Sequence, residues 1–112
     1  MKIYHNPRCR KSRETLEIIR QNGTEPEIIE YLTNPVSESE LKEVLGMLGI
    51  SAEQLLRKNE AVFKENFKGK NLSEDEWIKA MIEHPKLMER PIVVEGKKAV
   101  LGRPPENVKE LL

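Results

Sequence analysis

The first 32 residues alternate between strand, helix and strand patterns, and this order constrains the fold more than any other feature. Residues 3–5 form a short apolar run, and helical spacing of apolar side chains then continues to Asn22-Gly23, a typical helix end. Beyond Pro26, residues 27–32 contain Ile28, Ile29, Tyr31 and Leu32 and indicate a second strand. Two strands joined by a helix are normally parallel with a right-handed crossover. We therefore predict an α/β fold that opens with a β-α-β unit.

The middle of the chain is predicted to be helical because three serines mark helix starts. Ser37, Ser51 and Ser73 are each followed three residues later by Glu or Gln, which is the capping-box pattern. Apolar residues at helical spacing follow the first and third of these serines. We predict a helical insert at about residues 37–88, with residues 66–71 as its most loop-like part.

The last quarter of the chain returns to strand. Residues 91–94 and 98–101 flank Glu95-Gly96-Lys97, a hairpin pattern, and Pro104-Pro105 opens a final helix. The order predicts a thioredoxin-like α/β fold, with a mixed four-stranded sheet and the helical insert between the second and third strands. A chain of 112 residues is large enough for one modest core. We expect one domain over residues 1–112.

Composition excludes several classes of function. Nineteen basic and nineteen acidic residues cancel, so no overall charge attracts nucleic acid or an anionic membrane. No apolar run approaches the roughly 20 residues that span a bilayer, and no signal peptide is recognisable. A single cysteine suits a reducing compartment. We expect a cytoplasmic monomer that binds neither nucleic acid nor membrane.

The single cysteine, Cys9, lies where the first strand gives way to the helix. A helix N-terminus favours negative charge, and Arg8, Arg10, Lys11 and Arg13 belong to the same turn. Such surroundings lower a thiol pKa from its ordinary value of about 8.5. Most lone cysteines are small buried hydrophobes, but we do not expect one flanked by cations to be buried in apolar surroundings. The pattern favours a reactive thiolate.

Cys9 and Ser12 have the spacing of a Cys-x-x-Cys redox motif without the second thiol. Oxidised Cys9 would need an external thiol, such as glutathione, to be reduced. Ser12 could donate a hydrogen bond to the thiolate or cap the helix, and His5 could tune the thiol or be structural. A phosphatase loop is excluded because Thr15 stands where that loop needs arginine. Cys9, His5 and His84 offer too few ligands for a metal site.

Three arginines outside this segment lie near structural breaks. Arg57 follows two leucines, and Arg90 and Arg103 each precede a proline, which restricts them to extended backbone. The planar guanidinium suits an oxyanion with several acceptor oxygens. Spacing alone favours three unrelated surface arginines over one anion site.

A series of short motifs resembles the glutaredoxin-coupled arsenate reductases of the ArsC family. The opening His5-Asn6-Pro7-x-Cys9-x-x-Ser12-Arg13-x-Thr15-Leu16 carries the likeness first. It continues, in order along nearly the whole chain, through Gly23-Thr24-Glu25-Pro26, Tyr31-Leu32-x-Asn34-Pro35, Leu55-Leu56-Arg57-Lys58-Asn59, His84-Pro85, Arg90-Pro91-Ile92-Val93-Val94 and Arg103-Pro104.

This resemblance implies a function and a set of site residues. Cys9 would attack arsenate, glutathione would attack the adduct, and glutaredoxin would reduce the product and release arsenite. The implied anion-binding residues are Arg57, Arg90 and Arg103, and the residues implied to tune the thiolate are His5 and Ser12. Pro91 matches a proline that is cis in thioredoxin-like proteins. No bound cofactor and no metal are implied, since glutathione acts as a co-substrate.

Two alternatives remain open. One is a glutathione-dependent thiol oxidoreductase that acts on another substrate, because Arg10-Lys11 replaces small residues usual in these reductases. The other is a transcription regulator of the Spx type, which binds RNA polymerase on a similar fold. Spx-type proteins often carry Cys-x-x-Cys and lack the full arginine set. The Cys-x-x-Ser motif and the three arginines favour the enzyme.

Overall fold

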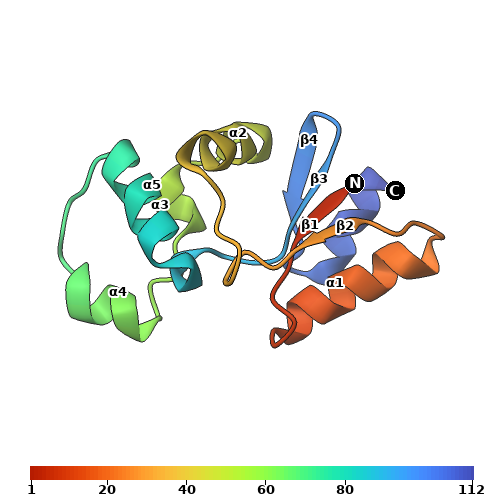
Figure 1. The fold of residues 1–112 in the computed structure, drawn as a ribbon, viewed down its shortest axis with the longest axis horizontal. Helices are drawn as coiled ribbons and strands as arrows, with labels where there is room; N and C mark the ends of the chain where they lie inside the picture. Colours follow the sequence, from red (N-terminus) through yellow and green to blue (C-terminus); the bar gives the residue numbers. More distant parts are fainter. The chain divides into compact units, whose positions relative to one another are not determined.

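The computed structural model describes all 112 residues, and the chain divides into two compact units (Figure 1). The first unit combines Met1–Asn34 with Arg90–Leu112, so both termini belong to it. The second unit is Pro35–Glu89, which corresponds to the region where the sequence indicates a helical insert.

The first unit contains a mixed four-stranded sheet in the order β2-β1-β3-β4. Its strands are β1 (Lys2–Tyr4), β2 (Glu27–Ile29), β3 (Ile92–Glu95) and β4 (Lys98–Leu101). β1 is parallel to β2 and antiparallel to β3, which forms a hairpin with β4. The predicted thioredoxin-like architecture, the opening parallel pair and the final hairpin are therefore confirmed.

The second strand is shorter than the sequence predicts. It ends at Ile29 because the N–H groups of Thr33 and Asn34 both donate to the carbonyl of Glu30 and close a turn. The apolar character of Tyr31, which suggested a longer strand, reflects burial in this turn, where the side chain is 2% exposed.

Two helices provide the apolar partners of one sheet face in this unit. α1 (Arg10–Gln21) contributes Leu16 and Ile19, and η2 (Pro105–Leu111), a 3₁₀ helix, contributes Val108. These residues pack with Ile3 of β1 and Val93 of β3, all nearly inaccessible to solvent. The first turn of α1 is thereby fixed at the end of β1.

The second unit is helical. Its elements are α2 (Glu38–Leu48), α3 (Ala52–Leu55), α4 (Ala61–Asn66), α5 (Glu74–Glu83) and the 3₁₀ helix η1 (Pro85–Leu87). Ser37, Ser51 and Ser73 are the N-caps of α2, α3 and α5, as predicted, and the boxes at Ser51 and Ser73 are reciprocal. The start of α4 has no side-chain cap, so no sequence signal marked it.

An aromatic cluster organises part of this unit. Phe63 and Phe67 lie with ring centroids 6.0 Å and 5.9 Å from Trp77, and Phe67 makes an edge contact with His84. Trp77 and Met81 are buried, which confirms that they are core residues. None of the helices in either unit is long and apolar enough to cross a membrane.

Candidate active site

Cys9 is the N-cap residue of α1. Its backbone is extended, with φ −94° and ψ 122°, and its N–H donates to the carbonyl of Asn6 over 3.0 Å. No side chain caps this helix, and no acidic residue lies in its first turn. The N–H groups that begin an α-helix have no partner within the helix. The Cys9 thiol is therefore the side chain nearest to the unpaired backbone N–H groups at the start of α1.

The pKa of the Cys9 thiol is lowered from its ordinary value. Burial raises the pKa, but the N–H groups of Ser12 and Lys11, together with the charge and a hydrogen bond of Arg90, outweigh it. The residue is only 8% exposed, yet the groups around its sulfur are polar. The thiolate is thus stabilised inside the protein rather than at its surface.

The source of this stabilisation differs from the sequence prediction. The cations adjacent in sequence, Arg8, Arg10, Lys11 and Arg13, all have exposed side chains. Arg10 pairs with Glu14, and Arg13 donates to the carbonyl of Pro7. None of these four side chains contributes to the lowered pKa, so the prediction that they do so is wrong. The effective cation comes from the other end of the chain.

Arg90 is that cation, and its guanidinium is incompletely paired. Its Nε and Nη1 atoms are buried and have no hydrogen-bond partner. A buried donor without a partner typically costs 1–3 kcal/mol or more, so native proteins seldom retain one without a reason. Two unused donors beside a thiolate form a place for acceptor oxygens.

The segment that follows β4 brings a second arginine to Arg90. The Nη1 of Arg103 donates to the carbonyl of Arg90 over 3.3 Å. The peptide bonds Arg90-Pro91 and Arg103-Pro104 are both cis, the first as the resemblance implied. Cys9, Arg90 and Arg103 all belong to the first unit.

Thr15 and Gly102 hold this segment against α1, a role that the sequence indicated for neither residue. The Gly102 N–H donates to the carbonyl of Pro91, and the Thr15 hydroxyl lies 2.8 Å from the carbonyl of Lys11 and 3.4 Å from that of Gly102. A Cβ on Gly102 would lie 2.5 Å from the Thr15 hydroxyl oxygen and 2.8 Å from Cγ of Pro91. Because residue 102 has no side chain, the backbone there can pack closely against Thr15 and Pro91, and this packing positions the next residue, Arg103.

His5 and Ser12 contact each other directly. The Nδ1 atom of His5 lies 2.6 Å from the Ser12 hydroxyl oxygen, which also accepts the N–H of Asn6 over 3.1 Å. Ser12 therefore links the histidine to the loop and does not cap α1 with its side chain. Burial lowers the pKa of His5, against the opposing charge of Glu30, so the neutral imidazole is favoured.

Arg57 belongs to the second unit and is fully engaged there. Its guanidinium pairs with Glu60 and, over 3.6 Å, with Glu89. Its N–H donates to the carbonyl of Leu87, beside the bridge between Leu56 and Met88. The sequence offered no sign of these acidic partners.

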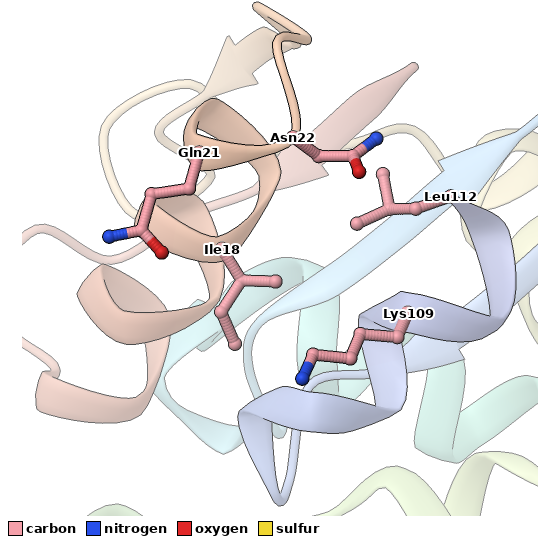
Figure 2. Close-up of a pocket in the computed structure, with 5 residues that line it drawn as sticks. All are labelled: Ile18, Gln21, Asn22, Lys109 and Leu112. Carbon is pink, nitrogen blue, oxygen red and sulfur yellow. The ribbon is translucent and has the colours of Figure 1, made fainter.

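Two other features bear on the position of the site. No three His, Cys, Asp or Glu side chains lie close enough to hold a metal ion. A hollow of about 430 Å³ lies between the end of α1 and η2, lined by Ile18, Gln21, Asn22, Lys109 and Leu112 (Figure 2). Since α1 has twelve residues and each rises about 1.5 Å, this hollow is about 18 Å from Cys9 along the helix.

Comparison with known proteins gives the family. Residues 4–111 match the family model described as ArsC family. The chain belongs to the ArsC family. Its match covers nearly the whole sequence, including Cys9 and the three arginines.

Several relatives and solved structures align with nearly the whole of this chain. The protein YfgD of Escherichia coli, described as uncharacterized, is 52% identical over 100% of this chain and 96% of its own. A Haemophilus influenzae protein named arsenate reductase is 46% identical over 98% of this chain and 97% of its own. The structure described as an arsenate reductase from Vibrio cholerae has a TM-score of 0.94 and 46% identity, covering 100% of this chain and 98% of that one.

Proposed function

We propose that this ArsC-family protein is an arsenate reductase that reduces arsenate to arsenite with glutathione and glutaredoxin. The observation that carries the proposal is the pairing of Cys9 with Arg90. A thiol with a lowered pKa lies beside two buried guanidinium donors that have no partner. Arsenate is a tetrahedral oxyanion, so its oxygens suit these donors while its arsenic faces the thiolate. Relatives named arsenate reductase support the choice of substrate.

The reaction then follows from one thiol in the protein and one in glutathione. The Cys9 thiolate attacks arsenic(V), a water leaves, and a Cys9–arsenic bond forms. Glutathione supplies the second thiol, two electrons pass to arsenic, and arsenite leaves while Cys9 and glutathione become a mixed disulfide. Cys9 is the only cysteine, so the disulfide cannot be resolved within the chain. Glutaredoxin takes the glutathionyl group and restores the thiol.

Other residues have supporting roles in this proposal. Arg103, which donates to the carbonyl of Arg90, joins Arg90 in holding the oxyanion. A role for Arg57 in holding the oxyanion stays a prediction of the family resemblance. His5 and Ser12 fix the loop that precedes Cys9, because they connect to each other and to the Asn6 N–H. No bound cofactor and no metal take part in the proposed reaction.

Intact-mass spectrometry tests the electron path. Arsenate plus glutathione should yield a protein that is heavier by one glutathionyl group, and the variant Cys9→Ser should remain unchanged. Glutaredoxin should remove this group faster than thioredoxin, and its addition should sustain NADPH-coupled turnover. Turnover with thioredoxin alone, in the absence of glutathione, would overturn the glutaredoxin-coupled route. Glutathionylation that requires a peroxide instead of arsenate would favour a thiol oxidoreductase with another substrate.

A further inference from the structure

A recess beside the β1–α1 loop is not used by the reaction as described so far. It has a volume of about 360 Å³ and is lined by residues 5–8 on one side and by Glu30, Leu32 and Thr33 on the other. This volume lies in the range of sites for small molecules, about 300–1,000 Å³. Its last residue on the loop side, Arg8, immediately precedes Cys9.

Hydrogen bonds fix both walls of the recess. On the loop side, Asn6 accepts the N–H of Arg8 with its side-chain oxygen over 3.0 Å. On the turn side, the carbonyl of Glu30 accepts two backbone N–H groups and lies 3.3 Å from the Thr33 hydroxyl. The N–H of His5 donates to the carbonyl of Ile29 and ties the two walls together. A recess held in this way needs little ordering when it binds a ligand.

The recess carries one cation and one anion. The side chains of Arg8 and Glu30 are exposed, and neither forms a salt bridge with another residue of the chain. Pro7 and Leu32 supply apolar surface between polar groups of Asn6 and Thr33. The complement of such a lining is a short zwitterionic molecule with a carboxylate for Arg8 and an ammonium group for Glu30.

We propose that this recess binds the thiol co-substrate, a zwitterionic peptide thiol of the glutathione type, through Arg8 and Glu30. This inference rests on the proposed function, because it gives the thiol that attacks the Cys9 adduct a binding site. Adjacent Cα atoms are about 3.8 Å apart, and an extended tripeptide spans about 10 Å. A tripeptide with one end at Arg8 is therefore long enough to bring its own thiol to Cys9. Exchange at a Cys9 disulfide has the same requirement: the incoming thiolate attacks the Cys9 sulfur, and the previous partner leaves as a thiolate.

The experiment uses a disulfide of Cys9 and contains neither arsenate nor glutaredoxin. The full chain is converted to its mixed disulfide with thionitrobenzoate, and release of this chromophore is followed as glutathione or 2-mercaptoethanol is added at low ionic strength. Arg8→Gln and Glu30→Gln should each slow the reaction with glutathione about two- to fivefold, the range expected for exposed ionic contacts. Neither should alter the reaction with 2-mercaptoethanol, which has no charged groups.

Matched controls come from residues close in sequence to Arg8 and Glu30, one in the first turn of α1 and one in β2. Lys11→Gln removes an exposed cation two residues beyond Cys9, and Glu27→Gln removes an exposed acid of β2, and neither residue lines the recess. Both controls should react with glutathione as the unaltered protein does. Equal slowing by Lys11→Gln and Arg8→Gln would overturn the proposal, since only the general charge would then matter. Parallel slowing with 2-mercaptoethanol would also overturn it, since the change would lie in Cys9 itself.

The outcome is separable from that of the proposed function. If the charge variants slow only the reaction with glutathione but the protein does not reduce arsenate, the recess is supported as a thiol-binding site and the proposed substrate is refuted. If the protein reduces arsenate but the charge variants do not change its reaction with glutathione, the proposed function is supported and the recess is refuted as a thiol-binding site.

Discussion

The helices α1 and α2 have similar lengths, twelve and eleven residues, but their N-termini differ. In α2, the Ser37 side chain accepts the N–H of Glu40, and two glutamates occupy the first turn. In α1, Cys9 is the N-cap without a side-chain hydrogen bond, and the first turn has no acid. The first N–H groups of α2 thus have a side-chain partner from the adjacent sequence, whereas those of α1 are available to the Cys9 thiolate and to a bound anion.

The arginines Arg57 and Arg90 show the same contrast between the two units. Arg57 pairs with two carboxylates in the helical unit. Arg90, in the unit that carries Cys9, has two buried nitrogens without a partner. The arginine of the helical unit is thus neutralised by acidic neighbours, whereas the arginine beside Cys9 keeps buried donors unpaired, which is the usual relation between a scaffold and a site that must bind an anion.

The largest effect is expected at Arg90. Arg90→Ala should lower kcat/KM for arsenate roughly ten- to a hundredfold, because it removes charge-assisted contacts worth about 1.5–3 kcal/mol. Arg90→Lys should restore only part of the loss, since lysine lacks the planar fork. The free energy of unfolding should change little, because removal of two buried donors without a partner offsets the loss of the charge and the hydrogen bond that Arg90 gives to Cys9. Steady-state kinetics and urea denaturation measure the two quantities.

Arg57→Ala provides the matched comparison. It should lower the free energy of unfolding by about 1 kcal/mol, because Glu60 and Glu89 lose their shared cation. The family resemblance further predicts a loss of kcat/KM similar to that of Arg90→Ala. If Arg57→Ala kept the kinetics of the unaltered protein while Arg90→Ala did not, the oxyanion would be held by the first unit alone. Normal kinetics in both variants would place the oxyanion elsewhere.

The two regions also differ in how far the sequence could predict them. The helix starts at Ser37, Ser51 and Ser73 were predictable because a serine and the residue three positions later form a local pattern, whereas the start of α4 has no such pattern. The mixed four-stranded sheet was predictable from the β-α-β unit and the final hairpin. The interaction between Cys9 and Arg90 was not predictable from spacing, since it joins residues from the two ends of the chain. The nearby cations drew attention instead, although their side chains are exposed to solvent.

The close packing of Gly102 and the ion pairs of Arg57 were likewise not predictable from the sequence. A glycine at a close approach is recognised only when the atoms facing it are known, here those of Thr15 and Pro91. Glu89 likewise reaches Arg57 across a separation of 32 residues, for which the sequence has no periodic signal. Capping hydrogen bonds and periodic apolar faces were predictable from the sequence, whereas contacts between residues far apart in the sequence were not.

A smaller effect, on the free energy of unfolding, should appear when the N-cap of α2 is removed and a serine N-cap is introduced in α1. Ser37→Ala should lower the free energy of unfolding by about 1 kcal/mol, the usual cost of losing an N-cap. Cys9→Ser should raise it by about 0.5–1 kcal/mol in mildly acidic buffer, because serine is a preferred N-cap and the extended backbone at this position suits it. Urea denaturation of both variants measures the opposite signs. A loss of stability in Cys9→Ser would show that α1 is already satisfied at its start.

The smallest effect, and the most direct test of the contrast, is the pH dependence of Cys9. Because the folded pKa is lowered, alkylation by iodoacetamide should have its midpoint at a lower pH in the native protein than in the denatured one. By linkage, the stability that comes from ionised Cys9 is fully present above the unfolded pKa and is lost as the pH falls through the folded pKa. Cys9→Ser should abolish this part of the pH dependence of unfolding.

Two variants identify the group that stabilises the thiolate. Arg90→Gln should raise the native midpoint, since Arg90 supplies both a charge and a hydrogen bond to the thiol. Lys11→Gln should leave the midpoint in place, because only the backbone N–H of Lys11 contributes and the substitution retains it. If Lys11→Gln raised the midpoint as far as Arg90→Gln, the adjacent cations would be the source after all. The open start of α1 would then be a local property of its own turn, without any need for the distant arginine.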